Sequence, residues 1–242
     1  MFKIYEKTQD FKEPDDLIYY LVASNGLFQI KKTRFFKSNT LIFEPKGKKN
    51  LGWLEKHGAG IELTLPFKFP FELVQQIMEF FRRVCDKHNG SEAICLIYWS
   101  EEEKAYKIIV PEQKVEPSRV HCEVGKNPEG LTRVGTIHSH GSTRAFHSGV
   151  DDKDEKNDDG IHVTVGGVGS LLETPSISCS VVVDGQRQML KPQDLIERMP
   201  QIVIPKDWMG KVKKAEVKTF DLAPSFGHPG WPSLKRKGVK IG

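Results

Sequence analysis

The sequence lacks any long uninterrupted hydrophobic run. No stretch of about 18 apolar residues, the minimum for a membrane-spanning helix, occurs in the 242-residue chain. The first residues, MFKIYEKTQDF, also lack the apolar core of a secretory signal peptide. We therefore expect a cytoplasmic protein without a membrane partner.

Cysteine is scarce and dispersed. The four cysteines, at positions 85, 95, 122 and 179, form no CxxC pair, which argues against a structural zinc module and against a disulfide framework. Free thiols in a reducing compartment are the simplest interpretation. Apolar residues make up 38% of the chain and charged residues 28%, as in a globular protein that buries its core without such crosslinks.

An excess of one charge occurs only near the C-terminal end. The formal net charge is +4, yet residues 205–242 alone contain nine Lys and Arg against three acidic residues. A basic segment can bind nucleic acid. A solvated tail is the commoner case, and this one contains no nucleic-acid-binding motif. We therefore expect no nucleic-acid partner.

Three regions differ in pattern. Residues 1–70 predict a small β-rich domain, in which Asn25-Gly26 between two apolar runs is a strong hairpin signal. Residues 71–190 predict a mixed α/β domain, because an amphipathic helix over residues 71–88 precedes several strand-like runs. Residues 191–242 predict a basic, proline-containing C-terminal extension.

The end of the α/β region contains a polar stretch between strands. Residues 141–160 include DDKDEKND, which predicts a short helix. Two strand-like runs follow, IHVTVGGVG and ISCSVVVDGQRQML, and the second is expected to turn at Asp184-Gly185.

The segment HSHGSTRAFHSGVDDKD, residues 138–154, has the residue types of a metal site. His138 and His140 follow the strand-like run VGTI, and residues i and i+2 of a strand face the same side, so both imidazoles can reach one ion. Ser148 and Asp151 come after a loop long enough to return to the strand end. Two imidazoles, one carboxylate and an open fourth position are typical of catalytic zinc, whereas closed structural sites usually contain more Cys.

Other polar residues of this region are weaker candidates. An isolated HxH pair alone would be weak support for a metal site, and His147 and His162 do not fit the spacing. They are interpreted as surface or core histidines. Asp154 lies three residues after Asp151, on the same face of a helix. It is either a partner that orients a ligand histidine or a solvated charge.

The complete spacing, His138-x-His140, seven residues, Ser148, two residues, Asp151, resembles the motif of the JAMM (JAB/MPN) zinc metalloproteases. Members of that family remove ubiquitin or ubiquitin-like proteins from conjugates. The resemblance covers about residues 71–190 and implies a JAMM/MPN-like, cytidine-deaminase-like fold with a central mixed sheet flanked by helices. In the family a glutamate after the first helix completes the site, and Glu92 matches it.

The resemblance also implies a role for each matched residue. His138, His140 and Asp151 would hold Zn²⁺, Glu92 would be the general base, and Ser148 would hydrogen-bond the oxyanion. The chain further resembles the bacterial branch of the family, which includes PRTRC system protein A and JAB peptidases encoded beside ubiquitin-like conjugation genes. The stretches YYLVASNGLFQIKK and HSHGSTRAFHSGVDDKDE carry this closer likeness.

The sequence departs from the family pattern at two positions. Gly141 follows His140 where many members have Pro, and Cys95 stands where many have Gly. Three further acidic residues, Glu101, Glu102 and Glu103, are rivals of Glu92, although they fall in a predicted turn, where acidic residues are normally solvated.

The leading functional hypothesis is a zinc-dependent isopeptidase or peptidase that cleaves after the C-terminal tail of a ubiquitin-like modifier. Its expected partners are that modifier or its conjugates, together with activating and conjugating enzymes of the same operon. Residues 114–130 and Phe146 are expected to border the substrate groove. Two alternatives are a non-catalytic MPN-type scaffold, which would usually lack the metal ligands, and a plasmid-maintenance accessory protein of the PRTRC type.

Overall fold

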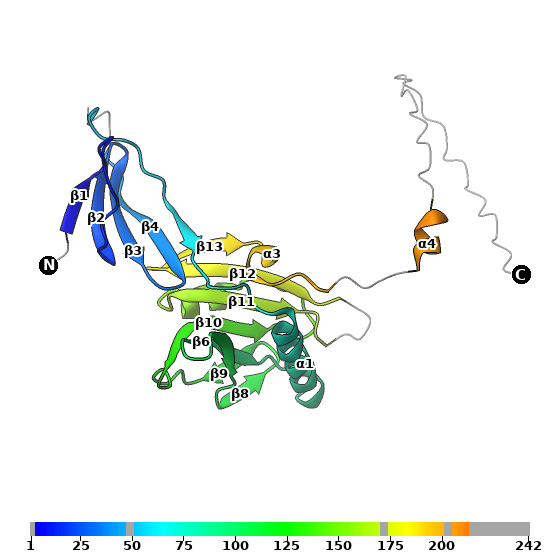
Figure 1. Cartoon of the computed structure of the whole chain (residues 1–242). Coiled ribbons are helices and arrows are strands. Elements are labelled where there is room, and N and C mark those ends of the chain that lie inside the picture. The colour runs from blue at the N-terminus through cyan, green and yellow to red at the C-terminus, as the bar shows by residue number, and fades with distance from the viewer. Residues whose placement is uncertain (1–2, 47–50, 170–173, 201–204, 213–242) are drawn as a thin grey trace, which may run out of the picture. The chain divides into compact units, whose positions relative to one another are not determined.

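The computed structural model describes residues 3–46, 51–169, 174–200 and 205–212 (Figure 1). It forms two compact units, Met1–Met199 and Pro200–Gly242. The second unit contains the described helix α4 (Lys206–Gly210), and most of the predicted basic extension lies outside the described residues. The domain boundaries predicted at residues 70 and 190 stay predictions. Among the described helices, none has the length and apolar character needed to cross a membrane.

The first unit begins with a five-stranded sheet in the order β1-β2-β3-β4-β5. β1 runs parallel to β2, and the remaining neighbours are antiparallel. The hairpin predicted at Asn25-Gly26 is confirmed by the pairing of β2 with β3. The strands are β1 (Lys3–Glu6), β2 (Ile18–Ala23), β3 (Gly26–Lys32), β4 (Phe36–Phe43) and β5 (Gly60–Leu63).

The predicted amphipathic helix is confirmed as α1 (Phe71–Lys87). It buries one stripe of side chains at three- and four-residue steps, Val74, Ile77, Phe81 and Cys85. The helix ends before Asn89 and Gly90, which both have a positive φ, of 53° and 82°. The predicted Asn-Gly stop is therefore confirmed by the backbone conformation.

A six-stranded sheet follows, in the order β13-β12-β11-β10-β6-β7 (Figure 1). β10 and β11 are parallel and the other neighbours antiparallel, which confirms a mixed α/β class. The cytidine-deaminase-like arrangement stays a prediction. The strands are β6 (Ile94–Ser100), β7 (Ala105–Ile109), β10 (Leu131–Ser139), β11 (Gly160–Gly166), β12 (Ser176–Val183) and β13 (Gln186–Leu190).

Three smaller elements complete this unit. The hairpin β8 (Gln113–Glu116) and β9 (Arg119–Cys122) forms a two-stranded sheet of its own. Helix α2 (Gly149–Glu155) confirms the short helix predicted between the strands, and α3 (Pro192–Leu195) follows β13. The predicted turn at Asp184-Gly185 connects β12 to β13.

The six-stranded sheet has two chemically different faces, because side chains alternate along each strand. One face is apolar and shares a core with α1; Ile97, Ile137, Val163 and Val181 belong to it. The opposite face is polar although it is buried, and includes Thr136, His138, His162, Thr164 and Ser180. Buried polar groups need partners, so this face is where a site is expected.

A β-bulge sets the alternation in β10. The register between β10 and β6 shifts between Arg133 and Gly135. As a result Val134 and Ile137 both lie in the apolar core although they are three residues apart. A Cβ atom at Gly135 would lie 1.8 Å from the carbonyl oxygen of Ile161, so only glycine lets β10 and β11 come this close.

The two large sheets are joined within the first unit by polar contacts. The Gln188 side-chain amide accepts from Ile61 N at 2.8 Å and donates to Ile61 O at 2.8 Å. Lys31 of β3 forms ion pairs with Asp184, at 3.0 Å, and with Asp159. The N-terminal sheet is thereby anchored to the β12–β13 side of the second sheet.

Candidate metal centre

Two imidazoles meet at the carboxyl end of β10. His138 and His140 are each only 6% exposed, and their Nε2 atoms lie 3.3 Å apart. The backbone N–H of His140 donates to Val165 O at 2.8 Å, which holds this residue beside β11 after β10 has ended. The convergence of residues i and i+2 on one side of the strand is the arrangement predicted from the spacing.

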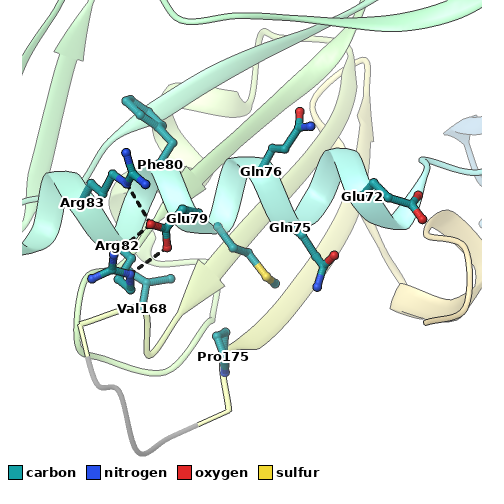
Figure 2. Close-up of a pocket in the computed structure, with 10 residues that line it drawn as sticks. Glu72, Gln75, Gln76, Glu79, Phe80, Arg82, Arg83, Val168 and Pro175 are labelled. Carbon is teal, nitrogen blue, oxygen red and sulfur yellow. Dashed lines mark hydrogen bonds and ion pairs between the residues drawn. The ribbon is translucent and has the colours of Figure 1, made fainter. Parts of the chain in front are cut away.

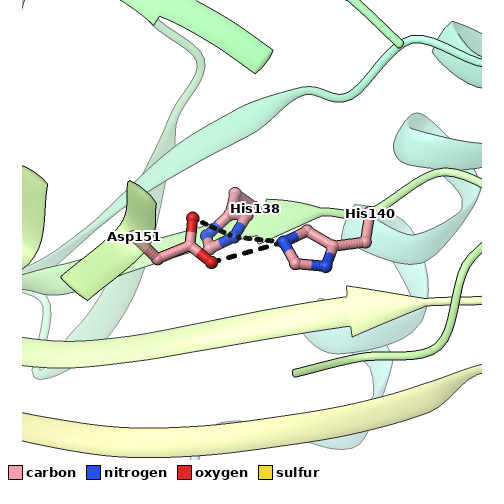
Figure 3. Close-up of side chains that lie close together, drawn as sticks. All are labelled: His138, His140 and Asp151. Atoms are coloured by element: carbon pink, nitrogen blue, oxygen red, sulfur yellow. Dashed lines mark hydrogen bonds and ion pairs between the residues drawn. The ribbon is translucent and has the colours of Figure 1, made fainter. Parts of the chain in front are cut away.

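Asp151 reaches the histidines because of how α2 begins. Ser148 is the N-cap of α2, and its Oγ accepts from Asp151 N at 3.2 Å. In return, Ser148 N donates to Asp151 Oδ2 at 2.6 Å, which completes a capping box. The two carboxylate oxygens of Asp151 then lie 3.4 Å from His138 Nε2 and 3.4 Å from His140 Nε2 (Figure 3).

These three side chains fit a zinc ion by their donor types and spacing. The donor atoms of His138, His140 and Asp151 all lie within 4.8 Å of one another. Ligands about 2.0–2.1 Å from a tetrahedral zinc ion are roughly 3.3 Å apart. The closest separations here, 3.3 Å and 3.4 Å, match that spacing. Two nitrogens and one oxygen are also the donor set of open, catalytic zinc sites.

The protonation states of His138 and Asp151 are those that a cation requires. Burial holds the pKa of His138 at about 4, so its imidazole is neutral and can donate a lone pair to a metal. Burial raises the pKa of Asp151, but its hydrogen bond with His140, the nearby His138 and the bonds from Ser148 outweigh burial and hold it well below its usual value. Burial lowers the pKa of His140, yet the Asp151 and Glu92 carboxylates raise it by more.

Glu92 lies in the same cavity as these donors, just before β6. Burial raises its pKa to about 7, and the His140 imidazole offsets only part of that rise. Its backbone N–H donates to Glu116 O at 3.0 Å, which ties it to β8. The Gln113 side-chain amide makes a second tie, accepting from Ile94 N at 2.9 Å and donating to Ile94 O at 3.1 Å.

The cavity is bordered by the segment that the sequence predicted as a flank. Lys114, Arg119 and Lys126 line it together with the donor residues and Ser148. Phe146 is 51% exposed and lines it too, with its ring edge-on to His140 at a centroid distance of 4.8 Å. The cavity that contains the three donor residues is therefore also lined by basic side chains and by an exposed aromatic ring.

Comparison with known proteins supports the same region. Residues 74–181 match the family model described as prokaryotic homologues of the JAB domain. The match supports a JAB-type domain. It runs from the first turn of α1 into β12 and includes all the predicted site residues. JAB domains include metalloproteases, so the match is compatible with a peptidase or a scaffold.

The remaining comparisons add little. A solution structure of a protein from Desulfitobacterium hafniense is 13% identical, with a TM-score of 0.33; the similarity covers 51% of this chain and 88% of that one. No curated protein matches the chain.

The acid of α2 that faces the histidines of the polar sheet face is Glu155. Asp154 is exposed, whereas Glu155 is 8% exposed and its pKa is raised to about 7 by burial, an effect that Arg187 partly offsets. Its Oε1 lies 3.9 Å from His138 Nδ1 and 3.5 Å from His162 Nδ1. The ordinary spacing of one helical turn after Asp151 would have indicated Glu155 in the sequence.

Two further residues, His162 and Arg187, were not predicted from the sequence to belong to the site. His162 is completely buried. The alternation of side chains along IHVTVG is the sequence signal that puts His162 on the same face of the sheet as His138. Arg187 of β13 had no such signal. The rival acids Glu101, Glu102 and Glu103 follow the opposite end of β6 from Glu92, roughly 20 Å away along a seven-residue strand.

Gly141 departs from the family's proline for a backbone reason. Its φ is +53°, a left-handed value that proline cannot adopt, and a Cβ there would lie 2.7 Å from Gly90 O. We expect Gly141→Ala to lower the free energy of unfolding by about 1–3 kcal/mol, and Gly141→Pro to lower it by more. Urea unfolding measures this, with Gly58→Ala as the control because a Cβ at Gly58 meets no atom within 4 Å. Equal stability of the two alanine variants would contradict the argument.

A second hollow lies along α1 and has a different character (Figure 2). Gln75, Gln76 and Phe80 line it together with Val168 and Pro175. Its acidic residue Glu79 is already paired with Arg82 and Arg83, each at 2.8 Å. Among the residues that line this hollow there is no His or Cys, so the candidate site is the cavity around His138.

Proposed function

We propose that this protein is a zinc-dependent isopeptidase or peptidase that cleaves after the C-terminal tail of a ubiquitin-like modifier. The observation that carries the proposal is the donor cluster of His138, His140 and Asp151, with closest separations of 3.3 to 3.4 Å, in a cavity that also contains Glu92 and Ser148. The match to prokaryotic JAB domains supports the same chemistry. The choice of substrate rests on the resemblance of the motif to that of the JAMM metalloproteases.

In the proposed reaction, each residue has a task that follows from its chemistry. His138, His140 and Asp151 would hold zinc, which when bound would supply a water with a pKa of about 7 and a Lewis acid for a carbonyl group. Glu92 accepts a proton from the attacking water and returns it to the leaving amine. Burial raises the pKa of the Glu92 carboxyl, which favours a group that can release a proton as well as accept one.

Ser148 has two compatible tasks. Its Oγ accepts the cap bond from Asp151 N through a lone pair, so the hydroxyl hydrogen can still be donated elsewhere. In the proposed reaction it is donated to the carbonyl oxygen as that atom becomes negative. The cap itself fixes where the hydroxyl lies relative to Asp151.

The proposed substrate segment is an extended, glycine-ending tail. An extended peptide can add to a sheet edge through backbone hydrogen bonds, which demands little of its side chains. The cavity offers such a place beside the β8–β9 hairpin, whose Lys114 and Arg119 line it. The modifier, its conjugates, and any activating or conjugating enzymes of the same operon are the proposed partners.

Among the alternatives, the scaffold has one observation against it. A scaffold needs neither a complete zinc donor set nor a buried acid beside it, and this cavity contains both. The plasmid-maintenance hypothesis has no specific residue in the described structure to favour it.

The test is cleavage of a fusion. A ubiquitin-like protein is joined through its terminal glycine to a reporter, and the products are identified by mass spectrometry. We expect cleavage directly after that glycine, loss of cleavage with a zinc chelator, and recovery when zinc is restored. A fusion with the terminal glycine pair deleted is the control. Chelator-resistant cleavage, or none by the zinc-loaded protein, would count against the proposal.

A further inference from the structure

One arginine from the far edge of the sheet joins helix α2 to two strands. Arg187 of β13 donates through Nη2 to Glu155 Oε2 at 2.6 Å, and its Nε forms an ion pair with Asp152 Oδ1 at 2.9 Å. Its Nη1 donates to Ser180 Oγ of β12. The Arg187 side chain is 17% exposed and that of Glu155 10%, so their contact is largely shielded from water, whereas the Asp152 side chain is 57% exposed. Asp152 and Glu155 are separated by about one turn of α2, the helix that also contains Asp151.

The other oxygen of Glu155 faces two histidine nitrogens. Oε1 lies 3.9 Å from His138 Nδ1 and 3.5 Å from His162 Nδ1. His162 Nε2 lies 2.8 Å from Asp158 O, a carbonyl that can only accept, so the His162 proton is on Nε2. Its Nδ1 is then an acceptor, and the Thr136 hydroxyl 2.9 Å away donates to it. Glu155 Oε1 therefore gains no hydrogen from His162.

In His138 the proton is expected on the other ring nitrogen, Nδ1. Its Nε2 faces the donor cluster, 3.3 Å from His140 Nε2 and 3.4 Å from Asp151 Oδ1. A neutral imidazole that uses Nε2 as a metal ligand carries its proton on Nδ1. That proton points to the side where Glu155 lies. Ligand histidines generally donate this second N–H to a carboxylate or carbonyl, which fixes the ring and strengthens the ligand.

We propose that Glu155 is the positioning residue for the ligand His138 and that Arg187 holds Glu155, through Oε2, in the orientation this requires. This inference rests on the zinc site of the proposed function. Arg187 lies outside residues 74–181, the part that matches the JAB model. The strand after the matched region thus contributes to the metal site of this chain.

The test measures zinc affinity of the full-length protein by competition with a chromophoric chelator, with zinc alone as the probe. Glu155→Gln has one acceptor oxygen where the carboxylate has two, so it cannot serve both His138 and Arg187. Loss of such a partner of a ligand typically weakens metal binding about 10- to 100-fold, and we expect that change in Kd for Glu155→Gln and for Arg187→Met. The control is Lys31→Met, which removes the partly buried ion pairs with Asp159 and Asp184 and should leave the Kd unchanged.

A double variant separates positioning from folding. Glu155→Leu with Arg187→Met removes both charges, so neither is left buried without a partner. We expect its zinc-free melting temperature to stay near the wild-type value and its zinc Kd to rise as in Glu155→Gln. The absorption spectrum of the cobalt-loaded protein should change as well, because it reports ligand geometry.

The outcomes separate this inference from the proposed function. Wild-type zinc affinity in the double variant and in Glu155→Gln would overturn it. A wild-type protein that binds no zinc would overturn it together with the metal centre. Weaker zinc binding by these variants supports it, even where the wild-type protein cleaves no fusion and the peptidase proposal fails.

Discussion

Replacing Glu92 by Gln is expected to lower kcat/KM for fusion cleavage by about 100- to 10,000-fold, the usual contribution of a general base. The amide matches the size of the carboxyl group, and the backbone bond from residue 92 to Glu116 O does not involve the side chain. The geometry of the cavity should therefore persist while proton transfer is lost. Turnover and zinc Kd, measured on the same preparation, check both parts.

Glu102→Gln is the matched control for Glu92→Gln. Glu102 is exposed in the turn after β6, at the other end of that strand, so the same chemical change there should leave turnover unchanged. Full activity of the Glu92→Gln variant with zinc bound would refute the assignment of the base. A loss of zinc from that variant would instead show that Glu92 acts on the metal ligands.

Asp151→Asn is expected to abolish the stabilisation that zinc gives to the folded protein. At a thousandfold excess of zinc over Kd, binding adds about 4 kcal/mol to the free energy of unfolding. For a chain of this size that corresponds to a rise in Tm of about 8–16 °C. The substituted side chain would lack the negative charge that attracts the cation, although its amide oxygen can still accept from Ser148 N and cap α2.

Calorimetry with and without zinc measures this difference directly. Asp86→Asn, on the outside of α1 where Asp86 pairs with Arg82 at 2.6 Å, is the control that should keep the full zinc-dependent rise. Asp151→Asn with the same rise as the wild-type protein would show that zinc does not use this carboxylate. No rise in any variant, wild type included, would refute the zinc site.

The donor cluster could be predicted from the sequence because local rules govern it. His138 and His140 share a side of one strand by alternation, and the Ser148-to-Asp151 spacing is also the spacing of a capping box. Only the return of the loop to the strand end had to be assumed. The proposed base Glu92 could not be placed by such rules, because its position depends on the backbone bond to Glu116 O of β8, a contact between separate segments that no local pattern predicts.

The residues around the donor cluster could not be predicted from local patterns, because their contacts depend on the order of the strands in the sheet. Arg187 reaches α2 only because β13 pairs with β12 and not with another strand. Nothing in the local pattern of QRQML marks Arg187, since an arginine on an edge strand is ordinarily solvated. Helical periodicity could have indicated Glu155 in the sequence. The choice between Glu155 and Asp154 required knowing which side of α2 packs against the sheet.

The bulge at Val134 and Gly135 determines which residues of β10 face each side of the sheet. Because alternation has a period of two, shifting the strand by one residue exchanges its faces. Deleting Thr136 or Ile137, the residues between the bulge and His138, would move every later residue back by one position. Both imidazoles would then turn toward α1, and Ser139 and Gly141 would take the positions that face Asp151. The donor cluster is therefore sensitive to the number of residues in the part of β10 that precedes His138. A one-residue deletion there should cost the protein its zinc site, while substitutions that keep the residue count and Gly135 would spare it.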